Sequence, residues 1–282
     1  MTGQSVKAKA ERLLALHAGP EVLVMPNAWD VVSAVILADL GFPAIATTSA
    51  GIAFARGYPD GQRIPRTEMI GEIERIARAV EIPVTADLEA GYGDGPEDVA
   101  ETISLAISVG VVGANIEDSY PDHPDRQYAA ADAALRIKTA RQAADAMGIP
   151  FVINARCDNF RPGRERNAAL ITDAIERLNA YKKAGAECLY TPWVGDADTI
   201  ARLVQNLDGP LNILAGPKTA AIGELKKLGV RRVTTGGGLY RSCLGHLEKA
   251  AHELQDLGTY DYTNGAFSHA AIDTLLGSEN GK

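Results

Sequence analysis

The sequence predicts an α/β protein built as a single (β/α)8 barrel of the TIM type, with extra helices at its C-terminal end. The first observation is an alternation of eight short apolar runs with longer stretches of helical periodicity. The second is length, because a barrel of this class takes about 250 residues and the chain has 282. The third is that no stretch rich in proline, glycine or serine divides the chain, so we expect one domain over residues 1–282.

The expected strands are apolar throughout, as parallel strands are when both of their faces are buried. In chain order they are 22–25, 44–48, 83–87, 112–117, 151–156, 188–191, 211–215 and 232–235. Helical periodicity fills the intervals at 29–40, 66–80, 96–109, 134–147, 168–183, 197–207 and 219–228. Glycines 110, 148, 185 and 229 follow four of these helices, where a left-handed residue commonly ends a helix.

A doubly wound open sheet is the competing architecture. It usually carries a glycine-rich turn after its first strand. Here the first strand is followed by Pro26-Asn27-Ala28-Trp29 instead, which favours the barrel.

A long helical pattern at 239–257 and a trailing segment at 258–282 follow the last strand. We expect this C-terminal segment, residues 239–282, to contribute to contacts between subunits of a dimer or tetramer.

The composition argues against several classes of protein and of partner. The chain has 36 acidic and 28 basic residues and a net charge of −8, which argues against nucleic acid or an anionic membrane surface as partners. No apolar run approaches the roughly 18 residues of a membrane helix, and the N-terminal residues lack the apolar core of a secretory signal. Three widely spaced cysteines argue against a disulfide framework or a structural zinc site. We therefore expect a cytoplasmic protein that acts on a small molecule.

Polar residues gather where the expected strands end, and active sites of such barrels lie at that end. Asp87 and Glu89 end the third strand, Glu117 ends the fourth and Arg156 ends the fifth. Three carboxylates at one rim must raise each other's pKa or share a cation. Oxygen ligands without histidine or cysteine select Mg²⁺, with Mn²⁺ as a substitute, while Arg156 suits a substrate carboxylate or phosphonate. The alternative is a rim of ordinary salt bridges.

Two further segments flank this rim. The small residues Ser49, Ala50 and Gly51 follow the second strand, so their N–H groups could approach an anion closely. Beyond them, residues 53–63 have the composition of a mobile flap that carries Asp60 over the site, with an ordinary surface loop as the alternative.

Five motifs at successive strand ends together resemble the isocitrate lyase/phosphoenolpyruvate mutase superfamily, from about residue 22 to residue 252. They are PNAWD at 26–30, TTSAG at 47–51, ADLEAGYG at 86–93, NIEDS at 115–119 and NARCDNF at 154–160. The resemblance implies a (β/α)8 barrel that binds Mg²⁺ and α-oxo or α-hydroxy acids and works through a pyruvate-type enolate. It also implies a tetramer in which a C-terminal helix is exchanged between neighbours.

The resemblance assigns roles to individual residues. The implied metal ligands are Asp87, Glu89 and Glu117, although the family often has aspartate at the position of Glu89. The resemblance implies that Ser49, Ala50, Gly51 and Arg156 bind substrate. We also expect Thr48, Asp87 and Thr191, which lie at strand ends, to contact substrate. The resemblance implies Asp60 as the acid on the gating loop and Arg156 as a partner of the substrate. From the chemistry of the site we also expect Tyr92 and Glu117 to be catalytic.

The loop after the fourth strand departs from the family. Its C–C lyases carry a cysteine there that protonates the departing enolate, whereas this loop reads EDSYPDHPDRQY. The Lys-Thr-Asn run of phosphonate-handling members is also absent. The remaining chemistry favours decarboxylation, because departing CO2 needs no general acid and water or Tyr92 could protonate the enolate. A retro-aldol cleavage would use Glu117 or Asp118 as base. The alternatives are a phosphonopyruvate-type hydrolase or mutase, and a barrel that binds oxo acids without turnover.

Overall fold

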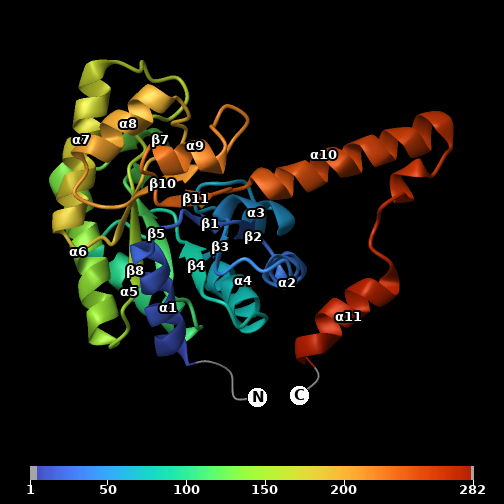
Figure 1. Ribbon diagram of the computed structural model, residues 1–282. Helices are drawn as coiled ribbons and strands as arrows, with labels where there is room; N and C mark the ends of the chain where they lie inside the picture. The colour runs from blue at the N-terminus through green and yellow to red at the C-terminus, as the bar shows by residue number, and fades with distance from the viewer. Residues whose placement is uncertain (1–4, 281–282) are drawn as a thin grey trace.

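The computed structural model describes residues 5–280 and contains one sheet of nine parallel strands, surrounded by helices (Figure 1). The strand order is β1-β11-β10-β9-β8-β5-β4-β3-β2. The two ends of this order, β1 (Leu23–Met25) and β2 (Asn27–Ala28), are separated in the chain only by Pro26. Because β1 pairs with β11 and β2 pairs with β3, the sheet closes into a barrel. Strands β1 and β2 together form the first of its eight strands. The predicted (β/α)8 barrel is confirmed.

Asn27 joins the two sides of this seam. Its side-chain Nδ2 donates to the Thr47 carbonyl, and its Oδ1 accepts from the N–H groups of Thr235 and Gly236. The first barrel strand therefore runs three residues beyond the expected 22–25. Pro26 interrupts its hydrogen bonding, but the chain continues in the same direction.

The other strands lie where the apolar runs predicted them. Their bounds are β3 (Ile45–Thr47), β4 (Val84–Asp87), β5 (Gly113–Glu117), β8 (Val152–Arg156), β9 (Cys188–Tyr190), β10 (Leu211–Leu214) and β11 (Arg232–Thr234). Almost every strand residue is buried, since helices cover the outside and side chains fill the inside.

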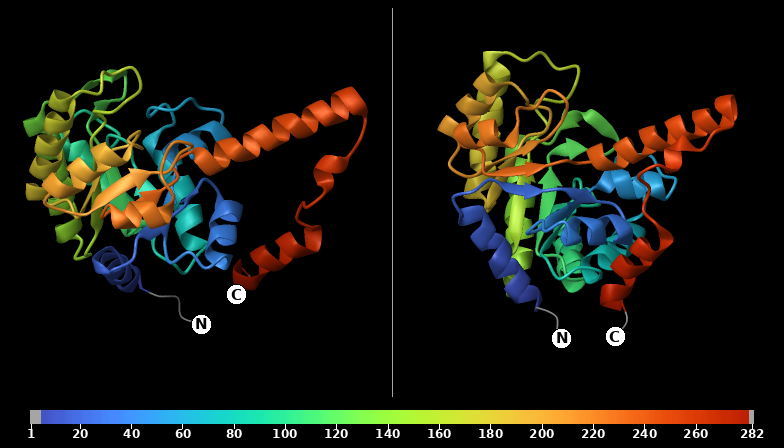
Figure 2. Two further views of the ribbon diagram at one scale, coloured as in Figure 1. Left: turned by 45° about the horizontal axis from the view of Figure 1, so that its top comes forward. Right: turned by 45° about the vertical axis from the view of Figure 1, so that its right-hand side comes forward.

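The helices of the outer ring are α2 (Val31–Asp39), α4 (Arg66–Arg78), α5 (Pro96–Ser108), α6 (Ala130–Ala146), α7 (Ala168–Lys183), α8 (Ala197–Asn206) and α9 (Ile222–Lys227). Figure 2 shows them around the sheet from two further sides. Helix α6 begins four residues before the expected start, because Ala130–Ala133 continue its helical backbone. Helix α9 begins three residues after the expected start, because the Thr219 hydroxyl and N–H are used in a turn with Gly216.

Three short elements add to the eight repeats. Helix α1 (Val6–Ala18) closes the N-terminal end of the barrel, where Ala10 and Leu13 pack against inner strand residues. Helix α3 (Ser49–Ala55) follows β3 directly, so the residues expected in a turn form its first turn. An antiparallel hairpin of β6 (Ser119–Tyr120) and β7 (His123–Gln127) follows β5.

The C-terminal segment departs from the barrel surface. Helix α10 (Gly238–His252) continues into a π-helical turn, η1 (Glu253–Leu257), that ends at left-handed Gly258. A 3₁₀ turn, η2 (Asp261–Thr263), leads to α11 (His269–Asn280), which returns to contact α2 (Figure 1). No residue of α10 is buried. The expected helix at 239–257 is confirmed, and it projects from the barrel with its apolar side chains exposed.

Within residues 5–280, no helix combines the length and the apolar character needed to cross a membrane.

Candidate functional site

A cavity of about 530 Å³ opens at the C-terminal ends of the strands. Eight of the residues expected at the site line it: Thr48, Ser49, Ala50, Asp60, Asp87, Glu89, Glu117 and Arg156. Strand register explains the convergence, because Asp87 lies beside Asn115, and Glu117 beside Arg156, on neighbouring parallel strands. Residues at the same level of parallel strands project from the same face and so meet at one end of the barrel.

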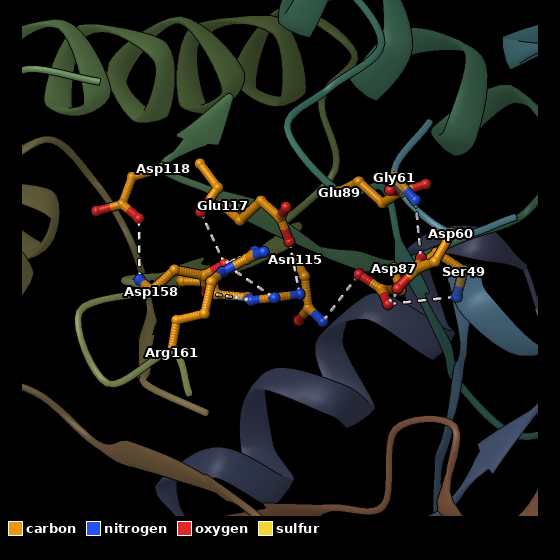
Figure 3. Close-up of polar contacts among 12 residues, drawn as sticks. Ser49, Asp60, Gly61, Asp87, Glu89, Asn115, Glu117, Asp118, Asp158 and Arg161 are labelled. Carbon is orange, nitrogen blue, oxygen red and sulfur yellow. Dashed lines mark hydrogen bonds and ion pairs between the residues drawn. The ribbon is translucent and has the colours of Figure 1, made fainter. Parts of the chain in front are cut away.

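Asp87 is tied to the start of α3. Its Oδ2 accepts hydrogen bonds from the Ser49 hydroxyl at 2.7 Å and the Ser49 N–H at 3.2 Å. Its Oδ1 lies 3.4 Å from Nδ2 of Asn115 (Figure 3). These contacts fix the orientation of the Asp87 carboxylate on the cavity wall.

Glu89 lies beside Asp87 in a strained backbone conformation, with a φ of 51°. It accepts hydrogen bonds from the Gln62 N–H at 2.8 Å and from the Tyr92 hydroxyl at 3.2 Å. Burial, together with the negative charges of Asp87 and Asp60, raises the pKa of Glu89 to about 8. Strain and a raised pKa in one cavity-lining carboxyl are typical of functional sites.

Arg156 lies in a cluster of acids and aromatic rings. Its Nη1 is 2.5 Å from Glu117, and its Nε and Nη2 donate to the two oxygens of Asp158. Its guanidinium carbon is 5.4 Å from the ring centroid of Trp193. Burial raises the pKa of Glu117, and the Arg156 charge opposes that shift. Arg156 is therefore fixed in place beside the cavity rather than free to swing.

Asp118 lies beside Asp158, on the side of the cluster away from Asp87 (Figure 3). It does not line the cavity. Its oxygens accept from the Tyr181 hydroxyl, the Gln127 amide and the Asp158 N–H. Asp118 is thus an internal brace between β5, β8 and α7, and the expectation that it could act as a base is wrong in this geometry.

The expected flap at 53–63 is shifted, because residues 53–55 belong to α3, and we define the flap as residues 56–65 between α3 and α4. Asp60, Gly61 and Arg63 of the flap line the cavity. Burial and the charge of Asp87 raise the pKa of Asp60, which lies near Asp87 in Figure 3. The Gln62 side chain accepts from the Tyr92 N–H at 2.6 Å, and Arg63 pairs with Asp122 of the β6–β7 hairpin at 2.8 Å. These contacts tie the flap to the loop after β4 on one side and to the β6–β7 hairpin on the other.

Three expected site residues do not line the cavity. The Gly51 N–H donates to the Thr48 hydroxyl that caps α3, so it is not directed at an anion. The Tyr92 hydroxyl points to Glu89 instead of to the cavity. Thr191 is fully buried, because Tyr190 at the end of β9 takes the inward direction and its neighbour takes the outward one. These three placements correct the sequence-based expectation.

The sequence analysis missed several lining residues. They are Asn27, Asn115, Tyr190, Trp193 and three arginines, Arg63, Arg161 and Arg241. Asn115 could have been found from its position two residues before Glu117, on the same face of the strand. Arg241 could not, since it lies on α10, outside the eight strand ends.

The cavity supplies oxygen donors of the kind that Mg²⁺ prefers, among them Asp87, Glu89, Glu117, Asn115 and Ser49. Yet within residues 5–280, no three His, Cys, Asp or Glu side chains lie close enough together to form a direct ligand set. Mg²⁺ usually keeps several waters and takes only one or two carboxylates. The residues present therefore fit a hydrated ion near Asp87 better than a cage of three carboxylates.

The chain is similar to known proteins over most of its length. A crystal structure of a proposed lyase/mutase from Burkholderia cenocepacia is 41% identical, with a TM-score of 0.90, covering 96% of this chain and 97% of that one. An oxaloacetate decarboxylase of Pseudomonas fluorescens is 30% identical, covering 80% of this chain and 77% of its own. A probable 2-methylisocitrate lyase 2 of Corynebacterium glutamicum is 29% identical, covering 90% and 84%.

The family model described as phosphoenolpyruvate phosphomutase matches residues 13–255, a span that includes every strand of the barrel and all the cavity-lining residues named above. The match includes all five motifs at the strand ends, so the resemblance seen in the sequence is confirmed. The chain belongs to the phosphoenolpyruvate phosphomutase family.

Proposed function

We propose that the protein is a carbon–carbon lyase that cleaves a small α-oxo diacid through a pyruvate-type enolate, and that its reaction is decarboxylation. The observation that carries this proposal is that four carboxyl groups and four arginines line one cavity. The carboxyl groups are Asp60, Asp87, Glu89 and Glu117, and the arginines are Arg63, Arg156, Arg161 and Arg241. Such a site can hold both a cation, at its carboxylates, and anionic substrate groups, at its arginines.

The cofactor we propose is Mg²⁺, held near Asp87, with Glu89 and Glu117 contacting its water shell. When bound, the ion would act as a Lewis acid that stabilises negative charge developing on the substrate carbonyl oxygen. Asp87 is oriented for this role by Ser49 and Asn115, which hold its two oxygens in fixed directions.

The substrate would lie between α3 and Arg156. Ser49 and Ala50 line the cavity beside Asp87, so they would contact the carboxylate next to the oxo group. Arg156 would contact the distal end, where Glu117 and Asp158 keep its guanidinium plane fixed. Closure of the flap would exclude water from the reacting centre and so strengthen these electrostatic contacts.

Decarboxylation suits the groups that are present. All three cysteines lie in the described part of the chain and none lines the cavity, since Cys157 and Cys188 are buried elsewhere and Cys243 is on α10. A lyase that needs a thiol acid would lack it here, whereas loss of CO2 needs no acid in the cleavage step. The relative named oxaloacetate decarboxylase supports the same reaction.

One second candidate is favoured by a specific observation. The cavity has three arginines beyond Arg156, more cationic groups than the strand ends alone suggested, and these would suit a phosphonate. A phosphonopyruvate-type hydrolase or mutase is therefore the alternative reaction. A retro-aldol cleavage is less well supported, because the only lining base expected for it, Glu117, is paired with Arg156.

The test is a panel assay. The protein with Mg²⁺ is given oxaloacetate, its 3-substituted analogues, 2-hydroxy diacids and phosphonopyruvate, and the products are followed by ¹H and ³¹P NMR. The proposal expects CO2 loss from a 2-oxo diacid above the rate with Mg²⁺ alone. Turnover of phosphonopyruvate alone would favour the second candidate, and binding without any turnover would show a barrel that only holds oxo acids.

A further inference from the structure

An enolate formed by CO2 loss must receive a proton on carbon, so the site needs a group that donates it. The sequence suggested Tyr92, but its hydroxyl is 3.2 Å from Glu89 and the residue does not line the cavity. The cavity-lining side chains include two other phenols, Tyr190 on β9 and Tyr120 on the β6–β7 hairpin.

Tyr190 lies on the inner wall of the barrel. It ends β9, with Arg156 of β8 as its register partner on one side and Asn212 of β10 on the other. Only 5% of the residue is exposed, and the Arg156 guanidinium carbon lies 5.9 Å from its ring centroid. The group that would fix the distal end of the substrate therefore lies directly beside this ring.

The Tyr190 hydroxyl is held by a hydrogen bond with Thr234 of β11, a residue that also lines the cavity. Thr234 is itself 3.2 Å from the Asn212 amide. The hydroxyl is thus positioned by neighbours on two adjacent strands. Asp87 and Tyr190 line the same cavity, so the phenol borders the space that the proposed metal side also borders.

Tyr120 has different surroundings. Its ring is stacked on Tyr128 with centroids 3.9 Å apart, and Arg126 lies over it at 5.4 Å. It belongs to the hairpin at the rim rather than to a barrel strand. Of the two phenols, Tyr190 alone lies between the proposed contacts of both ends of the substrate.

We propose that Tyr190 is the catalytic acid that protonates the enolate carbon. This inference rests on the proposed function. In the step, the electron pair of the enolate C=C forms a new bond to the phenolic hydrogen, and the enolate oxygen becomes the ketone oxygen of the product. The O–H bonding pair stays on the Tyr190 oxygen as phenolate, which takes a proton from water after the product leaves.

The surroundings of Tyr190 suit both states of this cycle. Burial raises its pKa, while Arg156 and Thr234 oppose that shift, so the phenol keeps its proton at neutral pH and the transient phenolate has a cation and a hydrogen-bond donor nearby. An enolate carbon is basic enough to take a proton from such a phenol.

The experiment reads the stereochemistry of proton delivery. The protein is given 3-methyloxaloacetate and Mg²⁺ in D2O, and the configuration of deuterium at C3 of the 2-oxobutyrate product is measured after reduction to a chiral derivative. Delivery by a fixed phenol gives one enantiomer, whereas delivery by free solvent gives a racemate. Tyr190→Phe keeps the ring and its packing but removes the acid, and Tyr120→Phe is the matched control.

We expect the wild type and Tyr120→Phe to give one enantiomer, and Tyr190→Phe to continue releasing CO2 while its product becomes racemic. A racemic wild-type product, or a Tyr190→Phe product as enantiomerically pure as that of the wild type, would overturn the inference. So would complete loss of CO2 release in a folded Tyr190→Phe variant, because the residue would then act in cleavage or binding.

A second readout separates this inference from the proposed function. Exchange of the pyruvate methyl hydrogens in D2O, followed by ¹H NMR, uses the protonation step in reverse and needs no decarboxylation. We expect Tyr190→Phe to slow this exchange by roughly 100-fold or more, the typical contribution of a general acid. Exchange by the wild type without CO2 release from any 2-oxo diacid would reject the proposed function alone, and undiminished exchange in Tyr190→Phe would reject Tyr190 alone.

Discussion

At the scale of single residues, Asp87 is the carboxylate on which the contacts of the cavity converge. Ser49 and Asn115 donate to it, and its charge raises the pKa of both Glu89 and Asp60. An added cation would relieve this concentration of negative charge, which is the physical reason for placing Mg²⁺ beside it.

Asp87→Ala should therefore abolish the dependence of activity on divalent ions and lower kcat/KM by at least ~100-fold, since the loss includes several kcal/mol of transition-state stabilisation. The fold should persist, because a rim carboxylate contributes little to the core. Asp145→Ala, on the exposed face of α6, is the control. Wild-type turnover by Asp87→Ala in the presence of EDTA would show that the metal assignment is wrong.

The residues at the cavity differ in how far the sequence could predict them. Asp87, Glu89, Glu117 and Arg156 were predictable, since polar residues that end apolar runs must lie at one end of the barrel. Tyr190 was not, because residues 188–191 are buried on both faces and no alternation of polarity shows which of them faces inward. Asp158 was also unpredictable, since its role as the partner of Arg156 depends on a loop conformation.

At the scale of elements, the flap is a short segment whose position depends on a few side-chain contacts. Gln62 holds it to Tyr92 and Glu89, and Arg63 holds it to the hairpin through Asp122. Gly57 and Gly61 have positive φ angles that other residues rarely adopt, so these positions can act as hinges.

Asp60→Ala should lower kcat by roughly 10-fold or more while changing the affinity for oxalate, an unreactive oxo-acid analogue, by less than about 3-fold. The reason is that Asp60 contacts the site only when the flap is closed, so its loss should fall on the transition state rather than on ground-state binding. Steady-state kinetics and oxalate titration measure the two quantities. Equal losses in kcat and in oxalate affinity, or no loss in either, would show that Asp60 takes no part in gating by the flap.

A second prediction at this scale concerns helix α1 and the dependence of stability on pH. Its His17 is buried, and burial together with the charge of Arg232 lowers its pKa to about 4 from 6.5. Because the folded pKa is lower, the unfolded chain takes up a proton first as the pH falls. The free energy of unfolding should therefore decrease by about 3 kcal/mol between pH 6.5 and pH 4 through this group alone.

Denaturant unfolding of the wild type and His17→Gln at several pH values measures this contribution as a difference. The difference between the two proteins should be constant above pH 6.5 and should shrink below it. His246→Gln, at an exposed position on α10, should follow the wild type throughout. A difference that does not vary with pH would show that His17 titrates normally in the folded protein.

At the scale of the whole molecule, the barrel and the projecting C-terminal segment differ in how well they were predicted. The barrel follows from the repetition of apolar runs, because only closure buries both faces and both edges of such a sheet. The direction of α10 does not follow from its periodicity, since a helix can pack on its own barrel or on another chain. Its leucines are exposed in the single chain, and Leu247 is 63% exposed.

We predict that the chain assembles as a dimer or tetramer through this segment, because exposed apolar side chains in one patch are typical of an interface. Light scattering should give a multiple of 29.8 kDa at micromolar concentration. Leu247→Glu should shift the protein toward the monomer, and Leu135→Glu, at a 49% exposed leucine on α6, should not. A wild-type mass near 29.8 kDa would contradict the assembly.

The central claim is that the carboxylates and arginines of the cavity cleave a carbon–carbon bond of a 2-oxo diacid. The most direct measurement is the rate of ¹³CO2 release from [4-¹³C]oxaloacetate with Mg²⁺, corrected for the rate with Mg²⁺ alone and compared between the wild type and Asp87→Ala. The account predicts wild-type release well above the corrected background, with pyruvate formed in equal amount and no excess from Asp87→Ala. Equal rates for the wild type, the variant and the metal alone would contradict it.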